Sequence, residues 1–162
     1  MEPRAHALWI ILVSFFLAFL LAIVPFPEWA MNYRPQWVVM VLVYWSMALP
    51  YRVGIGFAWV VGLMTDILEG SMLGLNALAL TVVVYITLSL HQRLRMFSAV
   101  QQSALVLALV GLHMLMVHWM KIATNQTVSS DLLFLLGALS SAFLWPWVYV
   151  VLRQLRVSFS VR

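Results

Sequence analysis

The sequence GIGFAWVVGLMTDILEGSMLGLN, residues 54–76, contains the most specific pattern in the chain. Six of its residues follow one another at intervals of four, and five of the six are small: Gly54, Ala58, Gly62, Asp66, Gly70 and Gly74. Residues at this spacing share one face of a helix, and a stripe of small side chains lets a second helix approach closely in a right-handed crossing. We therefore predict a helix over 53–68 whose small-residue face packs against another helix or binds a partner protein.

Asp66 is the ionisable residue of this stripe. It would lie about 21 Å along the helix from Arg52, in the outer part of a bilayer, where a charge is costly and rarely faces lipid. We expect it to face protein, with Asn76 as its nearest polar neighbour across the turn. Two interpretations stay open: a turn acceptor for the amides of connection 69–71, or an essential contact with another helix or a partner. In either case the glycines that follow favour a tight turn.

Outside this stretch the chain consists almost entirely of apolar runs with short interruptions. Of its 162 residues, 65% are hydrophobic and 9% are charged. Hydrocarbon offers the backbone no water, so such runs cross it as helices, and the sequence lacks the alternating segments of a membrane barrel. The predicted spans are 8–24, 36–50, 53–68, 72–90, 99–120 and 132–152. We predict an all-α integral membrane protein in which residues 1–162 form a single bundle of six transmembrane helices.

The Lys and Arg residues predict how the chain crosses the membrane. Arg34 and Lys121 lie in the first and fifth interruptions. The other seven lie in the tails or in the second and fourth interruptions: Arg4, Arg52, Arg93, Arg95, Arg153, Arg156 and Arg162. Because short cytoplasmic loops carry the Lys/Arg excess, both termini are predicted to be cytoplasmic. The formal charge of +4 does not indicate nucleic acid, since the cations are scattered along membrane edges and form no basic run.

Some of these cations are expected to set the depth of the helices. The second run is short, and Arg34 and Arg52 flank it about 27 Å apart along a helix, so that each can reach its own headgroup layer. Trp37 is expected at the same interface as Arg34. Arg153 and Arg156 are expected to mark the inner edge of the last span.

A short interfacial helix is predicted before the second run. Four aromatic residues recur there at spacings of three and four: Phe26, Trp29, Tyr33 and Trp37. That spacing is typical of one helix face. The stripe either anchors the loop in the membrane interface or forms a partner-binding surface.

A kink is predicted in the last span at Pro146. Proline lacks an amide hydrogen, so the carbonyl of Ala142 loses its helical donor. The kink should lie in the cytoplasmic third of the span.

No residue pattern indicates catalysis or a resident metal. Neither a His-Glu-x-x-His pair, nor paired membrane aspartates, nor a serine with a histidine base is found. His113 and His118 are five residues apart and would point about 140° away from each other on a helix, which suits packing better than a shared metal. The chain has no Cys. We predict a protein that is not an enzyme and carries no cofactor.

Residues of the region 34–78 resemble those of the bacterial rod shape-determining protein MreD family. The resemblance rests on RPQW at 34–37, YW at 44–45, ALP at 48–50, Arg52, Gly62, Asp66, Gly70, LG at 73–74 and AL at 77–78. LWPW at 144–147, before a basic tail, adds to it. The number and orientation of the predicted spans agree with the family over the whole chain.

This resemblance implies a non-enzymatic inner-membrane subunit of the cell-elongation machinery that makes peptidoglycan. It implies direct binding of MreC, a periplasmic protein with a single span, through membrane helices. The actin-like MreB, the polymerase RodA and the elongation penicillin-binding transpeptidase would belong to the same assembly. The resemblance also implies the six-helix fold of the substrate-binding subunits of vitamin transporters.

Two functional hypotheses follow. A membrane scaffold accounts for the small-residue helix faces, the short loops and the missing catalytic groups. A small-molecule-binding transport subunit is the alternative, because aromatic side chains such as Tyr44, Trp45, Trp59 and Tyr85 could line a pocket as well as fill a core. Few ionisable residues lie near the centres of the spans, which argues against ion-coupled transport.

Overall fold

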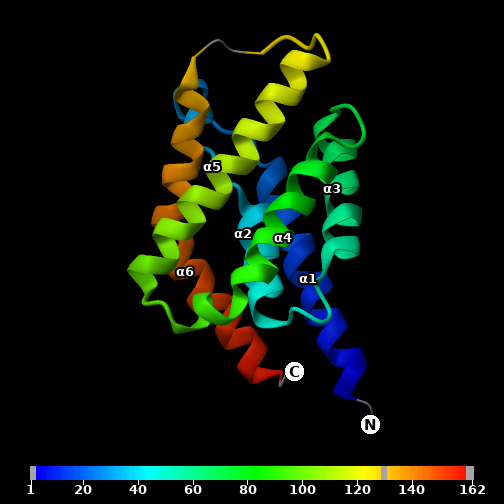
Figure 1. Cartoon of the computed structure of the whole chain (residues 1–162), viewed down its shortest axis with the longest axis vertical. Helices are drawn as coiled ribbons and strands as arrows, with labels where there is room; N and C mark the ends of the chain where they lie inside the picture. The colour runs from blue at the N-terminus through cyan, green and yellow to red at the C-terminus, as the bar shows by residue number, and fades with distance from the viewer. Residues whose placement is uncertain (1–2, 129–130, 160–162) are drawn as a thin grey trace.

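The computed structural model describes residues 3–128 and 131–159, without the side chains of residues 3–7 and 32. Arg162 and the side chain of Arg4, both counted above for the orientation, lie outside the described residues. The described chain is all-helical (Figure 1). Its elements are α1 (Pro3–Ile23), the 3-10 helix η1 (Glu28–Tyr33), α2 (Trp37–Ala48), α3 (Ile55–Glu69), α4 (Leu75–Met96), α5 (Ala99–Ala123), the 3-10 helix η2 (Leu132–Leu135) and α6 (Leu136–Ser158).

The six α-helices match the six predicted spans in number and order, with shifted ends. Several helices run past the apolar runs, because polar residues continue the last turns: α4 includes Arg93 and Arg95, and α6 includes Arg156. The predicted interfacial helix is present as η1, with 3-10 rather than α geometry. Trp29 and Tyr33 of η1 are exposed.

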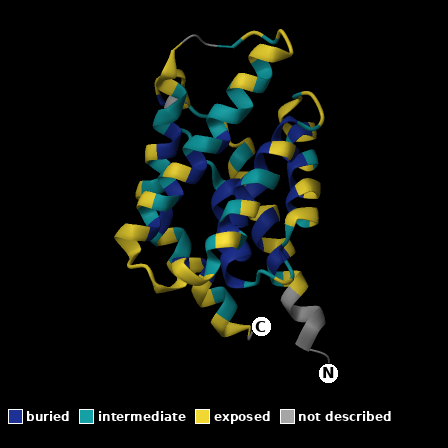
Figure 2. Ribbon diagram, viewed as in Figure 1, coloured by how far each residue is buried: buried dark blue, intermediate teal, exposed yellow. Residues whose placement is uncertain are grey.

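Helix α2 forms the centre of the bundle (Figure 2). It has 12 residues, and all but Trp37 are buried. It packs against α1, α4, α5 and α6. A helix that is apolar on all sides suits either a protein interior or the hydrocarbon of a membrane, and α2 is enclosed by protein. A helix surrounded by protein need not match the bilayer thickness, and the depth-setting role of Arg34 and Arg52 stays a prediction.

Three helical segments in the described chain are long and apolar enough to cross a membrane: Leu75–Met96, Ala99–Ala123 and Leu132–Ser158. Leu8–Ile23 and Trp37–Ala48 are shorter apolar helices. Many large apolar side chains on the outer surface are exposed, including Phe16, Phe143 and Trp147. This distribution is that of a membrane helical protein, whose outer surface contacts lipid.

The two ends of the bundle are formed by different segments of the chain. The start of α1 and the end of α6 lie together at the lower end in Figure 1. The α3–α4 turn, the end of α5 and η2 lie at the upper end. α3 packs mainly on α4, and Phe15 of α1 contacts Phe57 of α3 with ring centroids 5.2 Å apart. The upper end therefore brings together residues from 34–37, 66–76 and 113–128.

Candidate functional site

The turn between α3 and α4 contains two glycines with left-handed backbone. Gly70 ends α3 with φ 68°, and Gly74 precedes α4 with φ 104°. Side chains rarely adopt these angles, so glycine is strongly favoured at both positions. The amide of Ser71 donates to the carbonyl of Asp66 over 3.0 Å and closes the end of α3. The chain thereby reverses direction and places the start of α4 beside Asp66.

The carboxylate of Asp66 is fully buried and accepts four hydrogen bonds. Its Oδ1 accepts from the Ser71 hydroxyl at 2.8 Å, from the main-chain amide of Asn76 at 3.0 Å and from the side-chain Nδ2 of Asn76 at 2.9 Å. Its Oδ2 accepts from the amide of Gly74 at 2.9 Å. Both oxygens are used.

The hydrogen bonds of Asp66 combine parts of both interpretations given above. The main-chain amides that it satisfies belong to Gly74 and Asn76, not to connection 69–71. They lie at the start of α4, where amides lack helical acceptors and the helix dipole favours a negative charge. Asp66 is thus both a turn acceptor and a contact between two helices of the same chain.

Glu69 belongs to the same network. Its Oε2 accepts from Nδ2 of Asn76 at 3.1 Å, so the Asn76 amide group connects the two carboxylates. Unlike Asp66, Glu69 is exposed and lines two cavities described below. Sequence reasoning did not assign it a role, although its spacing of three residues from Asp66 places both on similar sides of α3.

The small-residue stripe packs against α4. Ala58, Gly62 and Asp66 are the members buried within α3, whereas Gly54 precedes the helix. A Cβ added at Gly62 would lie 2.2 Å from the Cα of Ala77, which belongs to α4. The same addition at Gly54, Gly70 or Gly74 would meet nothing within 4 Å. Close approach of the two backbones therefore depends on Gly62.

The residues proposed as membrane-edge anchors are spread over both ends of the bundle. Arg34 follows η1 and is half-buried, as is Trp37 at the start of α2. Arg52 is half-buried in the connection from α2 to α3. Near the end of α6, Arg153 is exposed and Arg156 is half-buried. Pro146 lies inside α6, which runs without interruption from Leu136 to Ser158.

Buried polar side chains join helices that are distant in sequence. The indole Nε1 of Trp45 donates to Oγ of Ser14 at 2.8 Å, which links α2 to α1. Oγ of Ser141 accepts from the amide of Gln36 at 2.9 Å, which links α6 to the start of α2. No hydrogen-bonding contact was assigned to either serine from the sequence. A serine within an apolar helix is also a signal for a hydrogen bond between helices.

Two further polar residues were missed. The Arg95 guanidinium donates to the carbonyls of Met47 (3.1 Å) and Ala48 (2.7 Å), which lack helical donors at the end of α2. The side chain of Gln102 donates to the carbonyl of Leu94 at 2.8 Å. Sequence reasoning used Arg95 only as an orientation signal, and its contact with α2 depends on the tertiary packing.

Two adjoining cavities with mixed linings lie at the upper end of the bundle. Their volumes are about 520 and 400 Å³, and both are lined by Gln36, Glu69, His113 and Lys121. His113 is 5% exposed, and neither ring nitrogen has a hydrogen-bond partner among the described residues. A buried polar atom without a partner costs about 1–3 kcal/mol. His113 is therefore the least satisfied buried polar group in the site.

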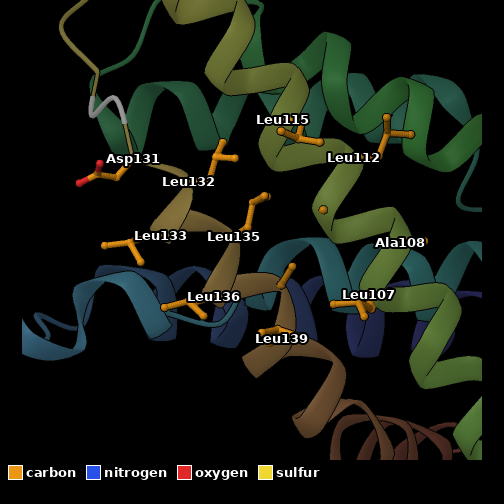
Figure 3. Close-up of a pocket in the computed structure, with 12 residues that line it drawn as sticks. Leu107, Ala108, Leu112, Leu115, Asp131, Leu132, Leu133, Leu135, Leu136 and Leu139 are labelled. Atoms are coloured by element: carbon orange, nitrogen blue, oxygen red, sulfur yellow. The ribbon is translucent and has the colours of Figure 1, made fainter.

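A larger apolar groove of about 870 Å³ lies between α5 and the start of α6 (Figure 3). Leucines line it from both sides, among them Leu107, Leu112 and Leu115 from α5 and Leu132 and Leu136 opposite. It opens onto the outer surface, where lipid tails would contact it. Asp131 lies at its edge, and the rest of its lining is apolar.

The predicted absence of a shared metal between His113 and His118 concerns side chains that the structure describes. Among the described residues, no group of three or more His, Cys, Asp or Glu side chains could hold a metal ion. His118 lies over Phe134, with ring centroids 4.5 Å apart and planes at 19°.

The fold and the buried polar contacts define a class: a helical membrane protein with a buried central helix, α2, and a buried carboxylate, Asp66, that joins α3 to α4. Within that class the comparisons identify a family. The family model for the rod shape-determining protein MreD matches residues 4–155. The rod shape-determining protein MreD of Haemophilus influenzae is 36% identical over 157 residues, which cover 96% of each chain. The chain belongs to the MreD family, and its role is in determining cell shape as part of the rod-shape machinery.

No solved structure matches the chain. The likeness to the substrate-binding subunits of vitamin transporters therefore stays a prediction.

Proposed function

We propose that this protein is a non-enzymatic scaffold subunit of the bacterial cell-elongation complex, in which it binds MreC through its membrane helices. The family match over residues 4–155 carries this proposal. In this role the protein helps to link cytoplasmic MreB to the periplasmic enzymes of wall synthesis. RodA and the elongation penicillin-binding transpeptidase belong to the same assembly.

The contacts within the bundle support a scaffold role. The polar side chains of Ser14, Asp66 and Ser141 join helices of the same chain. Such internal links make a rigid body, which can present fixed lipid-facing surfaces to another transmembrane helix. The residues 1–162 would act as one membrane domain.

The expected complex can be tested by extraction in mild detergent. MreC should be recovered with the tagged protein in a constant ratio, because packing between membrane helices persists in mild detergent. An unrelated tagged inner-membrane protein of similar hydropathy serves as the control. Recovery of this protein without MreC, from extracts in which other membrane complexes stay intact, would contradict the scaffold.

The proposed location is the inner membrane, with both termini in the cytoplasm. A reporter fused after Asp131 should face the periplasm, and one fused after Arg95 should face the cytosol, because the positive residues cluster on the Arg95 side. Paired alkaline phosphatase and fluorescent-protein fusions measure this directly. A cytosolic reporter after Asp131 would reverse the proposed orientation.

The alternative is a small-molecule-binding transport subunit. The observation in its favour is the pair of adjoining cavities with mixed linings at the upper end of the bundle. It requires a stoichiometric water-soluble ligand that stabilises the protein. Native mass spectrometry of the purified protein distinguishes such a ligand from a bound MreC helix or lipid.

A further inference from the structure

The two adjoining cavities are formed by segments that the chain brings together only on folding. Gln36 comes from the start of α2, Glu69 from the end of α3, and His113 and Lys121 from α5. Arg34 adds a second cation to the larger cavity. Volumes of about 520 and 400 Å³ are enough for a headgroup-sized ligand.

His113 marks the inner part of this site. It is 5% exposed and lines both cavities, and neither of its ring nitrogens has a hydrogen-bond partner among the described residues. A neutral imidazole offers one donor and one acceptor, and buried groups of this kind are nearly always paired. A ligand in the cavities could supply the missing partner.

The polar lining carries an excess of positive charge. Arg34 and Lys121 line the larger cavity together with one carboxylate, Glu69. Glu69 accepts a hydrogen bond from the neutral side chain of Asn76 and keeps its negative charge, so two cations face one carboxylate in this lining. Arginine and lysine are the usual partners of phosphate oxygens. The excess charge therefore favours an anion.

Apolar side chains also line the larger cavity. Phe19, Ile23, Leu68 and Leu80 line it beside the charged residues. Phe19 and Ile23 belong to α1, whose outer side is exposed. The cavity lies at one end of the helices, where a membrane-spanning bundle meets the headgroup layer whichever way it is inserted. A polar wall beside an apolar wall at this depth matches an amphiphile better than a water-soluble metabolite.

We propose that these cavities hold the phosphate-bearing headgroup of a membrane lipid, with the phosphate at Arg34 and Lys121, a headgroup oxygen at His113 and the acyl chains along the α1 side. The site is independent of MreC binding, and it does not require transport. It adds lipid recognition to the scaffold role.

The binding test uses delipidated protein in neutral detergent. Three probes are compared by thermal unfolding: phosphatidylglycerol, diacylglycerol with the same acyl chains, and inorganic phosphate. Phosphatidylglycerol should raise the melting temperature in a saturable way. Diacylglycerol lacks the phosphate and inorganic phosphate lacks the acyl chains, so neither of these should raise it. An equal effect of diacylglycerol would overturn the phosphate assignment. An equal effect of inorganic phosphate would overturn the lipid assignment.

Variants locate the site. Arg34→Gln with Lys121→Gln should weaken phosphatidylglycerol binding roughly tenfold or more, because two charge-assisted contacts are lost. Arg93→Gln is the control, since it removes an exposed cation near the opposite end of α4 from the cavities. Equal weakening by both changes would show a general surface effect and would overturn the proposal.

His113→Leu gives an independent measurement that does not depend on charge. Because the imidazole has no partner in the empty protein, leucine should leave the melting temperature of the lipid-free protein unchanged or raise it. The same change should weaken lipid binding. A variant with lower lipid-free stability and unchanged lipid affinity would assign His113 to packing alone and overturn its place in the site.

Discussion

Replacing Gly62 by leucine is expected to force α3 away from α4 and to destabilise the bundle by about 3 kcal/mol or more. The reason is geometric: a Cβ at this position would lie 2.2 Å from Cα and 2.6 Å from N of Ala77. These are backbone atoms in a helix, which cannot move aside as a flexible side chain can. Membrane insertion should persist, because leucine raises the hydropathy of α3, while recovery of MreC should fall as the helices separate.

The measurement is the apparent melting temperature in detergent, with an expected decrease of roughly 6–12 °C. Gly56→Leu is the matched control, because Gly56 lies in the same helix and a Cβ there would meet nothing within 4 Å. That control should change stability little, or raise it slightly through better helix propensity. Equal melting temperatures for the two variants would contradict the close α3–α4 contact.

Replacing Asp66 by leucine is expected to cost about 3–5 kcal/mol, because four buried or part-buried donors lose their acceptor at once. The amides of Gly74 and Asn76 would then face an apolar side chain at the start of α4. The turn should open and α3 should lose its place on α4. Protease susceptibility of the α3–α4 connection, together with the melting temperature, reports this change.

Asp66→Asn separates hydrogen bonding from charge. Its single carbonyl oxygen can replace Oδ1, which accepts three of the four bonds, but its NH₂ group cannot accept from the Gly74 amide. We therefore expect an intermediate cost of about 1–2 kcal/mol. A loss as large as that of the leucine variant would mean that the negative charge itself is required. Full stability in both variants would contradict the network.

Much of the architecture follows from local sequence. Apolar runs of helical length predict six membrane helices, and the described residues form six α-helices. The α3–α4 hairpin is similarly local, because Gly70 and Gly74 favour a turn and Asp66 and Asn76 are only ten residues apart. The small-residue pattern around Gly62 indicates a close helix contact for the same reason: its spacing is a property of the helix itself.

The candidate lipid site could not be predicted in this way. Arg34 and Glu69 are tens of residues from each other and from His113 and Lys121, which are eight residues apart in α5, so no motif or spacing joins the three segments. His113 in particular was interpreted as a packed residue. Its unpaired state becomes visible only when all the elements around it are in place.

The sequence by itself determined that this chain is a helical membrane protein, how many helices it forms and where the α3–α4 turn lies, because hydropathy, glycine conformation and helical spacing act over a few residues. Only the tertiary structure decided that α2 is the enclosed central helix, that the small-residue face of α3 packs against α4, and that distant polar residues share two cavities. Those outcomes depend on which apolar surfaces pack together, and packing is a property of the whole bundle.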